Sequence, residues 1–126
     1  MRIFSDNYLF WDALIFSRCA MRLGVVIYSD DSETVWNALR MANFALGQGD
    51  EVEVFLLAKG VELEHLDNAV FKVIEQAVNF KKSGGKILAC GTCLKLRKSE
   101  GTEMCPLSTM KDLYQLINGC DKVITF

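Results

Sequence analysis

The stretch LGVVIYSDDSETVWNALRMANFALGQGDEVEVFLL, residues 23–57, decides the fold. It opens with a continuous apolar run rich in Val and Ile, which is typical of a strand buried on both faces of a parallel sheet. Polar residues at 30–32 can then cap a helix, whose apolar stripe runs on to Leu46. Gly47 and Gly49 end this helix, and EVEVFLL begins a second strand. The order is therefore strand, helix, strand.

The same alternation continues to the end of the chain. We expect a helix within VELEHLDNAVFKVIEQAVNFKKSGGK, residues 61–86, because apolar side chains recur there at helical spacing: Leu66, Val70, Val73, Ile74 and Ala77. A strand at 86–90, a helix capped by Ser108 or Thr109, and a short strand at 120–126 follow. In that helix we expect four side chains to face inward: Met110, Leu113, Leu116 and Ile117. Short connections between such elements force right-handed parallel crossovers. We therefore predict an α/β protein, a three-layer α/β/α sandwich whose mainly parallel sheet has four to five strands.

Composition limits the class of protein. The 126 residues suit one globular domain, since 51% are hydrophobic and 24% are charged. A formal net charge of -2 gives no basic field for nucleic acid, so we expect no nucleic-acid partner. The odd number of cysteines, 5, does not resemble the framework of a secreted disulfide scaffold. We expect a cytoplasmic protein.

Residues 1–20 are expected to be an N-terminal extension, and residues 21–126 the domain proper. Asp6 and Asp12 interrupt the apolar character of the extension, which is too short of apolar residues to span a bilayer and lacks the pattern of a secretory signal. We expect no membrane partner. The extension is interpreted as a segment that packs on the body or on a neighbouring subunit.

The stretch CGTC, residues 90–93, carries the chemistry. Together with SDD and AKG, which follow the first two strands, it should lie at the carboxyl edge of the sheet, where open parallel sheets place their sites. Cys90 closes a strand and Cys93 falls in the first turn of the next helix, where backbone N–H groups favour a thiolate. We expect Lys95, Arg97 and Lys98 to lower the pKa of such a thiol. The alternative is a pair of buried, inert cysteines.

Other uses of the cysteines fit less well. Zinc or an iron–sulfur cluster would lack ligands, because the chain has no second C-x-x-C and its single histidine, His65, lies on a polar stretch. No glycine-rich phosphate loop is present, so we expect no cofactor and no metal. A thioredoxin-type redox pair fits by spacing but follows the third strand, and Pro106 is the one proline that could face it.

Beyond these local features, three stretches resemble the DsrE/DsrF-like family, which includes the TusD sulfur-relay subunits. They are residues 21–64, KILACGTCLKLRKSEG and CPLSTMKDLYQLINGCDKVITF, and together with the CGTC motif they point to a CGTC-containing subgroup. The resemblance implies a small α/β sandwich that assembles into homo-oligomers, trimers or hexamers. In sulfur-relay members it also implies that a cysteine after the third strand carries sulfane sulfur as a persulfide, passed between donor and acceptor proteins.

The functional prediction is a persulfide carrier, a sulfurtransferase-like protein if it is active. The resemblance places the carrier sulfur on Cys90, at the end of the third strand, with Cys93 near it as the alternative carrier. Cys105 is a candidate third thiol if its loop folds back over the strand edge, whereas Cys120 is expected in the core. The alternatives are a C-x-x-C thiol–disulfide redox protein and a non-catalytic assembly or regulatory module. Trp36, Phe44 and Tyr114 lie off the apolar stripes of their helices and could mark subunit contacts.

Overall fold

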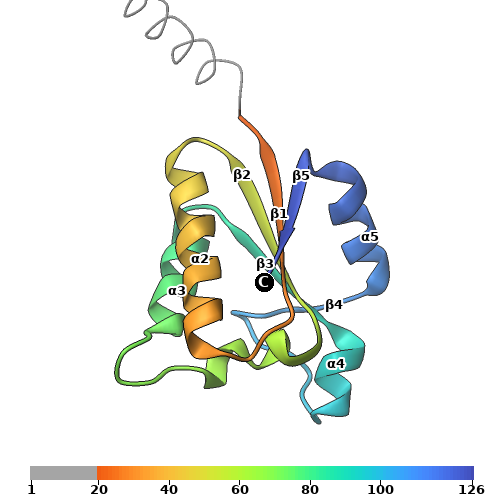
Figure 1. Cartoon of the computed structure of the whole chain (residues 1–126). Helices are drawn as coiled ribbons and strands as arrows, with labels where there is room; N and C mark the ends of the chain where they lie inside the picture. Colours follow the sequence, from red (N-terminus) through yellow and green to blue (C-terminus); the bar gives the residue numbers. More distant parts are fainter. Residues whose placement is uncertain (1–19) are drawn as a thin grey trace, which may run out of the picture.

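The computed structural model describes residues 20–126, so the expectations for residues 1–19 lie outside the described part of the chain. A central sheet separates two layers of helices (Figure 1). All four strand pairings are parallel, and the strand order is β4-β3-β2-β1-β5. The predicted three-layer α/β/α sandwich is thus confirmed, with five strands. The strands are β1 (Arg22–Ile27), β2 (Glu51–Leu56), β3 (Lys86–Cys90), β4 (Leu107–Ser108) and β5 (Lys122–Thr125).

Helices α2 (Ser32–Gly47) and α3 (Val73–Lys82) pack side by side on one face of the sheet (Figure 1). The side chain of Asp31 caps α2 by accepting the N–H of Thr34. This layer holds most of the core, because the sheet residues that face it are among the most deeply buried of the described chain: Val25, Ile27, Val54, Leu56, Ile87 and Ala89. Burial of this apolar surface is the main force that stabilises the fold.

Helix α5 (Met110–Gly119) covers the opposite face. Thr109 caps it, as predicted, in a reciprocal capping box with Asp112. Leu113 and Leu116 are buried against the sheet, and a Cβ atom on Gly24 would come within 2.5 Å of the Leu116 side chain. Met110 and Ile117 were also expected to face inward, but they are 60% and 51% exposed. The sequence pattern overestimated the width of the buried stripe.

The region expected to form one helix over residues 61–86 is divided. A 3-10 helix, η1 (Ala58–His65), is followed by an irregular loop, and α3 begins only at Val73. The side chain of Asn68 accepts the N–H groups of Val70 and Phe71, while Asp67 accepts the N–H of Ile74. Such local side-chain bonds compete with helix formation. Val70, expected in the buried stripe, is therefore 73% exposed.

Strand β4 was not anticipated. It comprises only two residues after Pro106, whose carbonyl oxygen accepts the N–H of Ala89 on β3. A pair of residues has no periodicity that a sequence could reveal. This short strand matters because it fixes the loop that carries Cys105 along the edge of β3.

Candidate functional site

Cys90 and Cys93 lie at the carboxyl edge of the sheet, where β3 passes into the short helix α4 (Gly91–Leu96). Cys90 is the last residue of β3 and is only 3% exposed. Gly91 follows because the chain passes close to β4: a Cβ atom there would lie 2.8 Å from the carbonyl oxygen of Ser108. The tight crossing of β3 and β4 therefore accounts for the glycine of the CGTC stretch.

Cys93 lies in the first turn of α4 and is half-buried. Its Sγ accepts a hydrogen bond from the backbone N–H of Ala58, with 3.2 Å between nitrogen and sulfur. Ala58 has φ 50°, a left-handed conformation that a residue with a Cβ seldom adopts. Such conformations persist only where the surrounding structure holds them, and they cluster at functional sites. The strained residue thus supplies a polar donor directly to the half-buried thiol of Cys93.

The AKG segment is held in place by the end of the first strand. A Cβ atom on Gly60 would lie 2.0 Å from the carbonyl oxygen of Ile27, so only glycine fits at this crossing. The N–H of Leu57 also donates to the carbonyl of Ile27. The prediction that the AKG and CGTC segments meet at one edge of the sheet is confirmed by the bond between Ala58 and Cys93.

An ion pair links the same two segments. The guanidinium of Arg97, at the end of α4, pairs with the carboxylate of Glu62 on η1, with 3.1 Å between Nε and Oε1. Arg97 also donates to the carbonyl oxygen of Cys93. An exposed ion pair contributes little to overall stability. Here it ties α4 to the segment whose backbone binds the sulfur.

The electrostatics of Cys93 differ from the expectation. Burial raises the pKa of the Cys93 thiol, and the hydrogen bond and charge of the adjacent Cys90 raise it further, whereas the N–H of Ala58 and the cation of Arg97 lower it. The predicted lowering of the pKa is therefore wrong in its net direction. Helix α4 has only six residues, so its dipole is weak, and Lys95 and Lys98 point their charges into solvent.

The two sulfur atoms nevertheless act on each other. Both cysteines are free thiols, and the neighbouring Cys90 is one of the groups that raise the pKa of Cys93. The site thus combines the buried thiol of Cys90 with the half-buried thiol of Cys93. This geometry suits a reaction in which the outer sulfur meets a reagent and the inner sulfur responds.

Cys105 belongs to a different environment. It is 2% exposed, and burial raises the pKa of its thiol to about 12, with the carboxylate of Glu64 raising it further and Lys81 opposing the effect. Glu64 also accepts the hydroxyl of Thr102. Lys81 donates to the carbonyl oxygens of Glu103 and Met104, which fixes the loop. The loop does fold back along the edge of β3, but its thiol interacts with Glu64 rather than with the CGTC pair.

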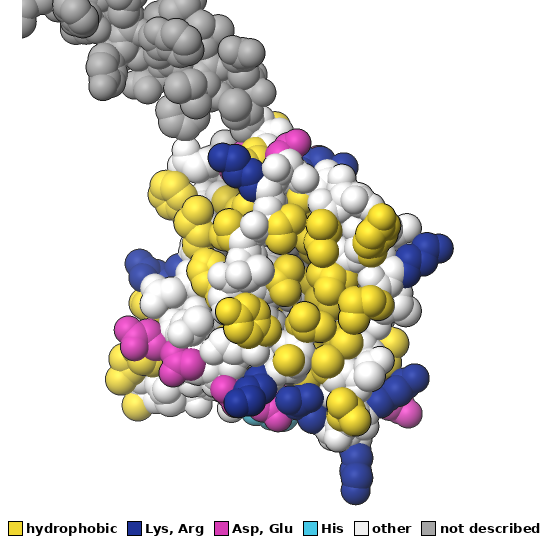
Figure 2. All heavy atoms as spheres, turned by 45° about the vertical axis from the view of Figure 1, so that its right-hand side comes forward, with side chains coloured by type: hydrophobic (Ala, Val, Ile, Leu, Met, Phe, Trp, Pro, Cys, Tyr) yellow, Lys and Arg dark blue, Asp and Glu magenta, His cyan; other side chains and the backbone are white. Residues whose placement is uncertain are grey.

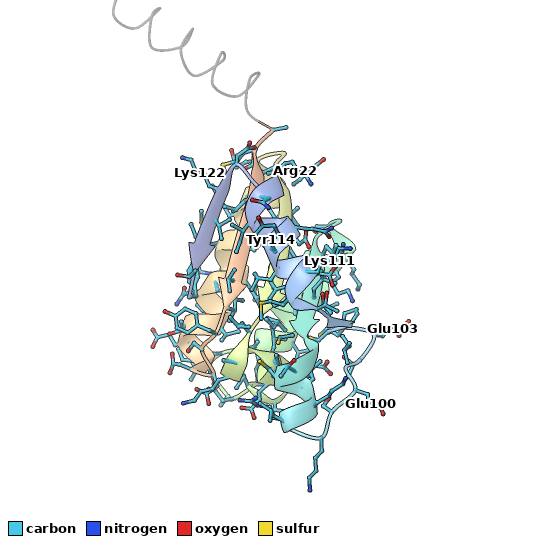
Figure 3. The ribbon with its side chains drawn as sticks, turned by 90° about the vertical axis from the view of Figure 1, so that its right-hand side faces the viewer. Arg22, Glu100, Glu103, Lys111, Tyr114 and Lys122 are labelled. Carbon is cyan, nitrogen blue, oxygen red and sulfur yellow. The ribbon has the colours of Figure 1, made fainter. Side chains whose placement is uncertain are left out.

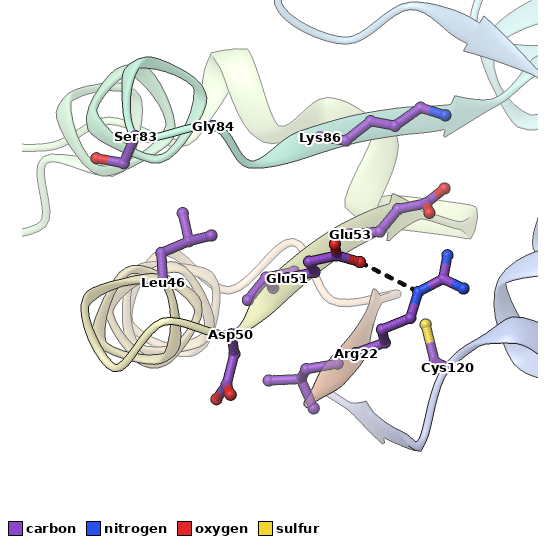
Figure 4. A pocket seen from close by; sticks show the side chains of 11 residues that line it. Arg22, Leu46, Asp50, Glu51, Glu53, Ser83, Gly84, Lys86 and Cys120 are labelled. Carbon is purple, nitrogen blue, oxygen red and sulfur yellow. Dashed lines mark ion pairs between the residues drawn. The ribbon is translucent and has the colours of Figure 1, made fainter. Parts of the chain in front are cut away.

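Cys120 lies at the opposite end of the sheet, at the end of α5. It is half-buried and borders a pocket of about 380 Å³ (Figure 4). Arg22, Glu53 and Lys86 line the same pocket, and Arg22 pairs with Glu51. Burial raises the pKa of the Cys120 thiol. Cys19, for which no role was predicted, lies outside the described residues.

Two further observations bear on the class of site. Within residues 20–126, no group of three His, Cys, Asp or Glu side chains is arranged to hold a metal ion. Every helix in this part of the chain also falls short of the length and apolarity needed to cross a bilayer.

Comparison with known proteins shows the family to which the chain belongs. Residues 21–126 match the DsrE/DsrF-like family, and the chain belongs to that family. An uncharacterized protein of Methanocaldococcus jannaschii is 35% identical over 100 residues, covering 75% of this chain and 88% of that protein. An uncharacterized protein of Methanopyrus kandleri is 34% identical over 104 residues, covering 75% of this chain and 83% of that protein. Membership of the family favours a function of the sulfur-relay type.

Sequence reasoning missed the residues that support the thiol pair. Ala58 was placed at the correct edge of the sheet. An alanine in the sequence, however, does not indicate a left-handed conformation or a backbone N–H that donates to a sulfur. Glu62 and Glu64 occur in a polar stretch with helical character, and nothing local indicates that one faces Arg97 and the other Cys105. These partners depend on how η1 packs.

Proposed function

We propose that this protein carries sulfane sulfur as a persulfide on Cys93, with Cys90 as the supporting thiol beneath it. The observation that carries the proposal is the half-exposed Cys93 sulfur, which accepts the N–H of Ala58 at 3.2 Å. A backbone N–H aimed at sulfur stabilises negative charge there, both on the attacking thiolate and on the same sulfur when it leaves. The family resemblance assigned the carrier position to Cys90, but its 3% exposure favours the supporting role.

The chemistry is an exchange of sulfur between thiols. The Cys93 thiolate attacks the outer sulfur of a donor persulfide, a new S–S bond forms on Cys93, and the bond within the donor breaks. The electron pair of that bond leaves with the donor sulfur, which then takes up a proton. The raised pKa of Cys93 means that loading should become faster as the pH rises through the range in which the thiol ionises.

A second candidate is a thiol–disulfide redox protein, which the spacing of the two cysteines across the junction of β3 and α4 favours. The Cys90 thiolate would attack the inner sulfur of a Cys93 persulfide, forming a disulfide and expelling hydrosulfide. An external dithiol would then have to reduce the disulfide. This attack takes place within one chain. The buried Cys90 thiol therefore does not have to be reached by a partner.

Intact-mass measurement after incubation with inorganic polysulfide tests the proposal. We expect the wild type and Cys90→Ser to gain sulfur that dithiothreitol removes, and Cys93→Ser to gain none. Cys120→Ser serves as a matched control, because that thiol is half-buried at the other end of the sheet and its loss should leave loading intact. Loading of Cys93→Ser equal to that of the wild type would refute the proposal. Loss of two hydrogens in place of a gain in sulfur would favour the redox function.

We further infer that the protein forms a homo-oligomer, a trimer or hexamer as the family resemblance implies. Met110, Tyr114 and Ile117 recur at helical spacing on the outer face of α5 and are all at least half exposed. Figure 2 shows hydrophobic side chains gathered over the side that carries α5 and β5. Replacing Tyr114 with Glu should lower the molar mass measured by light scattering. An unchanged mass would count against this surface, and an oligomer without sulfur loading would favour a non-catalytic assembly module.

The free thiols of the described chain, at positions 90, 93, 105 and 120, suit a reducing compartment. This supports the proposed cytoplasmic location. Donor and acceptor proteins remain part of the proposal, since a carrier must be both loaded and unloaded.

A further inference from the structure

We propose that the acceptor which takes sulfur from Cys93 is a protein segment that surrounds its own thiol with acidic side chains and an apolar contact residue. This inference rests on the carrier function proposed above. It names the chemistry of the partner, which follows from the surface next to the thiol.

Exposed lysines lie on the two segments that meet at Cys93. Lys59 follows Ala58, the residue whose N–H contacts the sulfur, and Lys95 and Lys98 project from α4 and its end; all three are exposed. Among residues 20–126, no carboxylate lies within ion-pair distance of these lysines. Glu62, the acidic residue that faces α4, is already paired with Arg97. The positive charge here contrasts with the formal charge of -2 for the whole chain.

The acidic residues of the neighbourhood lie further along the chain. Glu100 and Glu103 point outward from the loop that follows α4 (Figure 3). In Figure 2, Lys and Arg side chains with some acidic ones between them occupy the lower end of the molecule, where Figure 1 places α4. The exposed lysines on α4, at its end and on η1 are the cations with which an approaching acidic segment would pair. Opposite charges on that segment would speed encounter and fix its register.

An apolar side chain stands beside the same thiol. Leu96 is 78% exposed, the largest fraction among the big apolar side chains of the described chain. It lies three positions after Cys93 on α4, so the two residues share one helix face. Folding gains nothing from so exposed a leucine, whereas an interface with a partner would bury it.

The transfer step balances without an outside oxidant. The acceptor thiolate attacks the outer sulfur of the Cys93 persulfide, the S–S bond on Cys93 breaks, and its electron pair stays on the Cys93 sulfur. The acceptor becomes the persulfide, and Cys93 returns to a thiol by taking up the proton that the acceptor lost. The N–H of Ala58 is placed to stabilise the departing Cys93 sulfur.

Two synthetic peptides of equal length test the inference, each with one central cysteine and one leucine. One peptide places Asp and Glu around the cysteine, and the other places Lys there. The full-length protein is loaded with polysulfide, and the rate of sulfur transfer to each peptide is followed by mass spectrometry at low and high salt. We expect transfer to the acidic peptide to be about tenfold faster at low salt, and the difference to shrink at high salt.

Matched variants localise the effect. Lys59→Glu with Lys95→Glu should remove the preference for the acidic peptide, while Lys111→Glu with Lys122→Glu makes the same change of charge on α5 and β5 (Figure 3) and should preserve it. Leu96→Ser should slow transfer to the leucine peptide, with Val70→Ser, at 73% exposure, as its control. Both lysine pairs and both apolar residues are exposed, so folding should be unaffected.

The outcomes separate the two proposals. If Cys93 loads with sulfur but both peptides react at equal rates, or if the control pair alters the preference as much as the test pair, the acidic partner is wrong and the carrier function stands. If Cys93 does not load at all, the carrier function itself fails. A preference for the lysine peptide would overturn the inference outright.

Discussion

Cys93 and Cys105 flank the same end of β3, yet their surroundings are opposed. The sulfur of Cys93 is half-exposed and meets a backbone N–H and a cation. The sulfur of Cys105 is 2% exposed and meets the carboxylate of Glu64. Position near the carboxyl edge of the sheet is therefore not enough to make a thiol reactive. Burial decides most of the difference, and the polar groups that η1 brings to each sulfur add to it.

The largest effect should be seen in alkylation rates. Because burial and Glu64 raise the pKa of Cys105 to about 12, its thiolate fraction near pH 8 should fall roughly a thousandfold below that of an unfolded cysteine. Iodoacetamide labelling with peptide mapping should therefore modify Cys93 in the native protein and leave Cys105 intact until urea is added. Equal labelling of Cys93 and Cys105 in the native protein would show that their surroundings do not differ in effect. In Glu64→Gln, Cys105 should label faster than in the wild type.

Alkaline stability should carry the next largest effect. A folded-state pKa of about 12 for Cys105, against ~8.5 in the unfolded chain, means that the folded state holds its proton longer as the pH rises. Its stabilising effect is complete below pH ~8.5 and is lost above it at up to ~1.4 kcal/mol per pH unit. Urea unfolding between pH 7 and 10 should give a steeper loss of stability for the wild type than for Cys105→Ala. Parallel curves would show that folding does not raise the pKa of this thiol.

Relief of the strained backbone at Ala58, next to Cys93, should change the free energy of unfolding less than the ionisation of Cys105 does. Ala58→Gly relieves the left-handed conformation at φ 50° and should raise the free energy of unfolding by about 1 kcal/mol. Gly49→Ala is the reverse control, because φ is 92° there and nothing lies within 4 Å of the added Cβ, so a similar loss is expected. Urea denaturation measures both. A destabilising effect of Ala58→Gly would contradict the interpretation that the backbone at Ala58 is strained.

The smallest effect concerns the pH profile of Cys93 itself. Cys90 raises the pKa of Cys93 through its hydrogen bond and its charge, so Cys90→Ala should move the alkylation profile of Cys93 to lower pH. Arg97→Gln should move it to higher pH, since the guanidinium lowers that pKa. Rates measured from pH 6 to 10 would reveal both shifts. Movement of the two profiles in the same direction would contradict this account.

The fold could be predicted because β1, β2 and β3 contain apolar runs and α2 has a regular stripe and a cap. Local hydrogen bonds at Asp67 and Asn68 broke the expected helix, and such competition depends on geometry that apolar spacing does not contain. Strand β4 was too short to have a pattern. The two exposed positions of α5, Met110 and Ile117, reflect how far that helix is covered, which a single sequence leaves open.

The candidate site could be located but not characterised. The spacing of Cys90 and Cys93 and the ends of the strands were sufficient to bring CGTC and AKG together. The charge balance was not, because desolvation and the neighbouring thiol outweigh the cations that sequence places nearby. The sign of a pKa shift depends on distances and burial, and neither is written in the order of residues.

The bond from Ala58 to Cys93 joins residues 35 positions apart. During synthesis the second half of the site therefore leaves the ribosome well after the first, and the sulfur meets its amide partner only once β2 and β3 have paired. A nascent or locally opened chain would expose ordinary cysteines with no means to stabilise a leaving sulfur. Sulfur exchange at this position should thus require an intact tertiary structure. Ageing or heat-damaged molecules should lose sulfur-exchange activity before they lose their secondary structure.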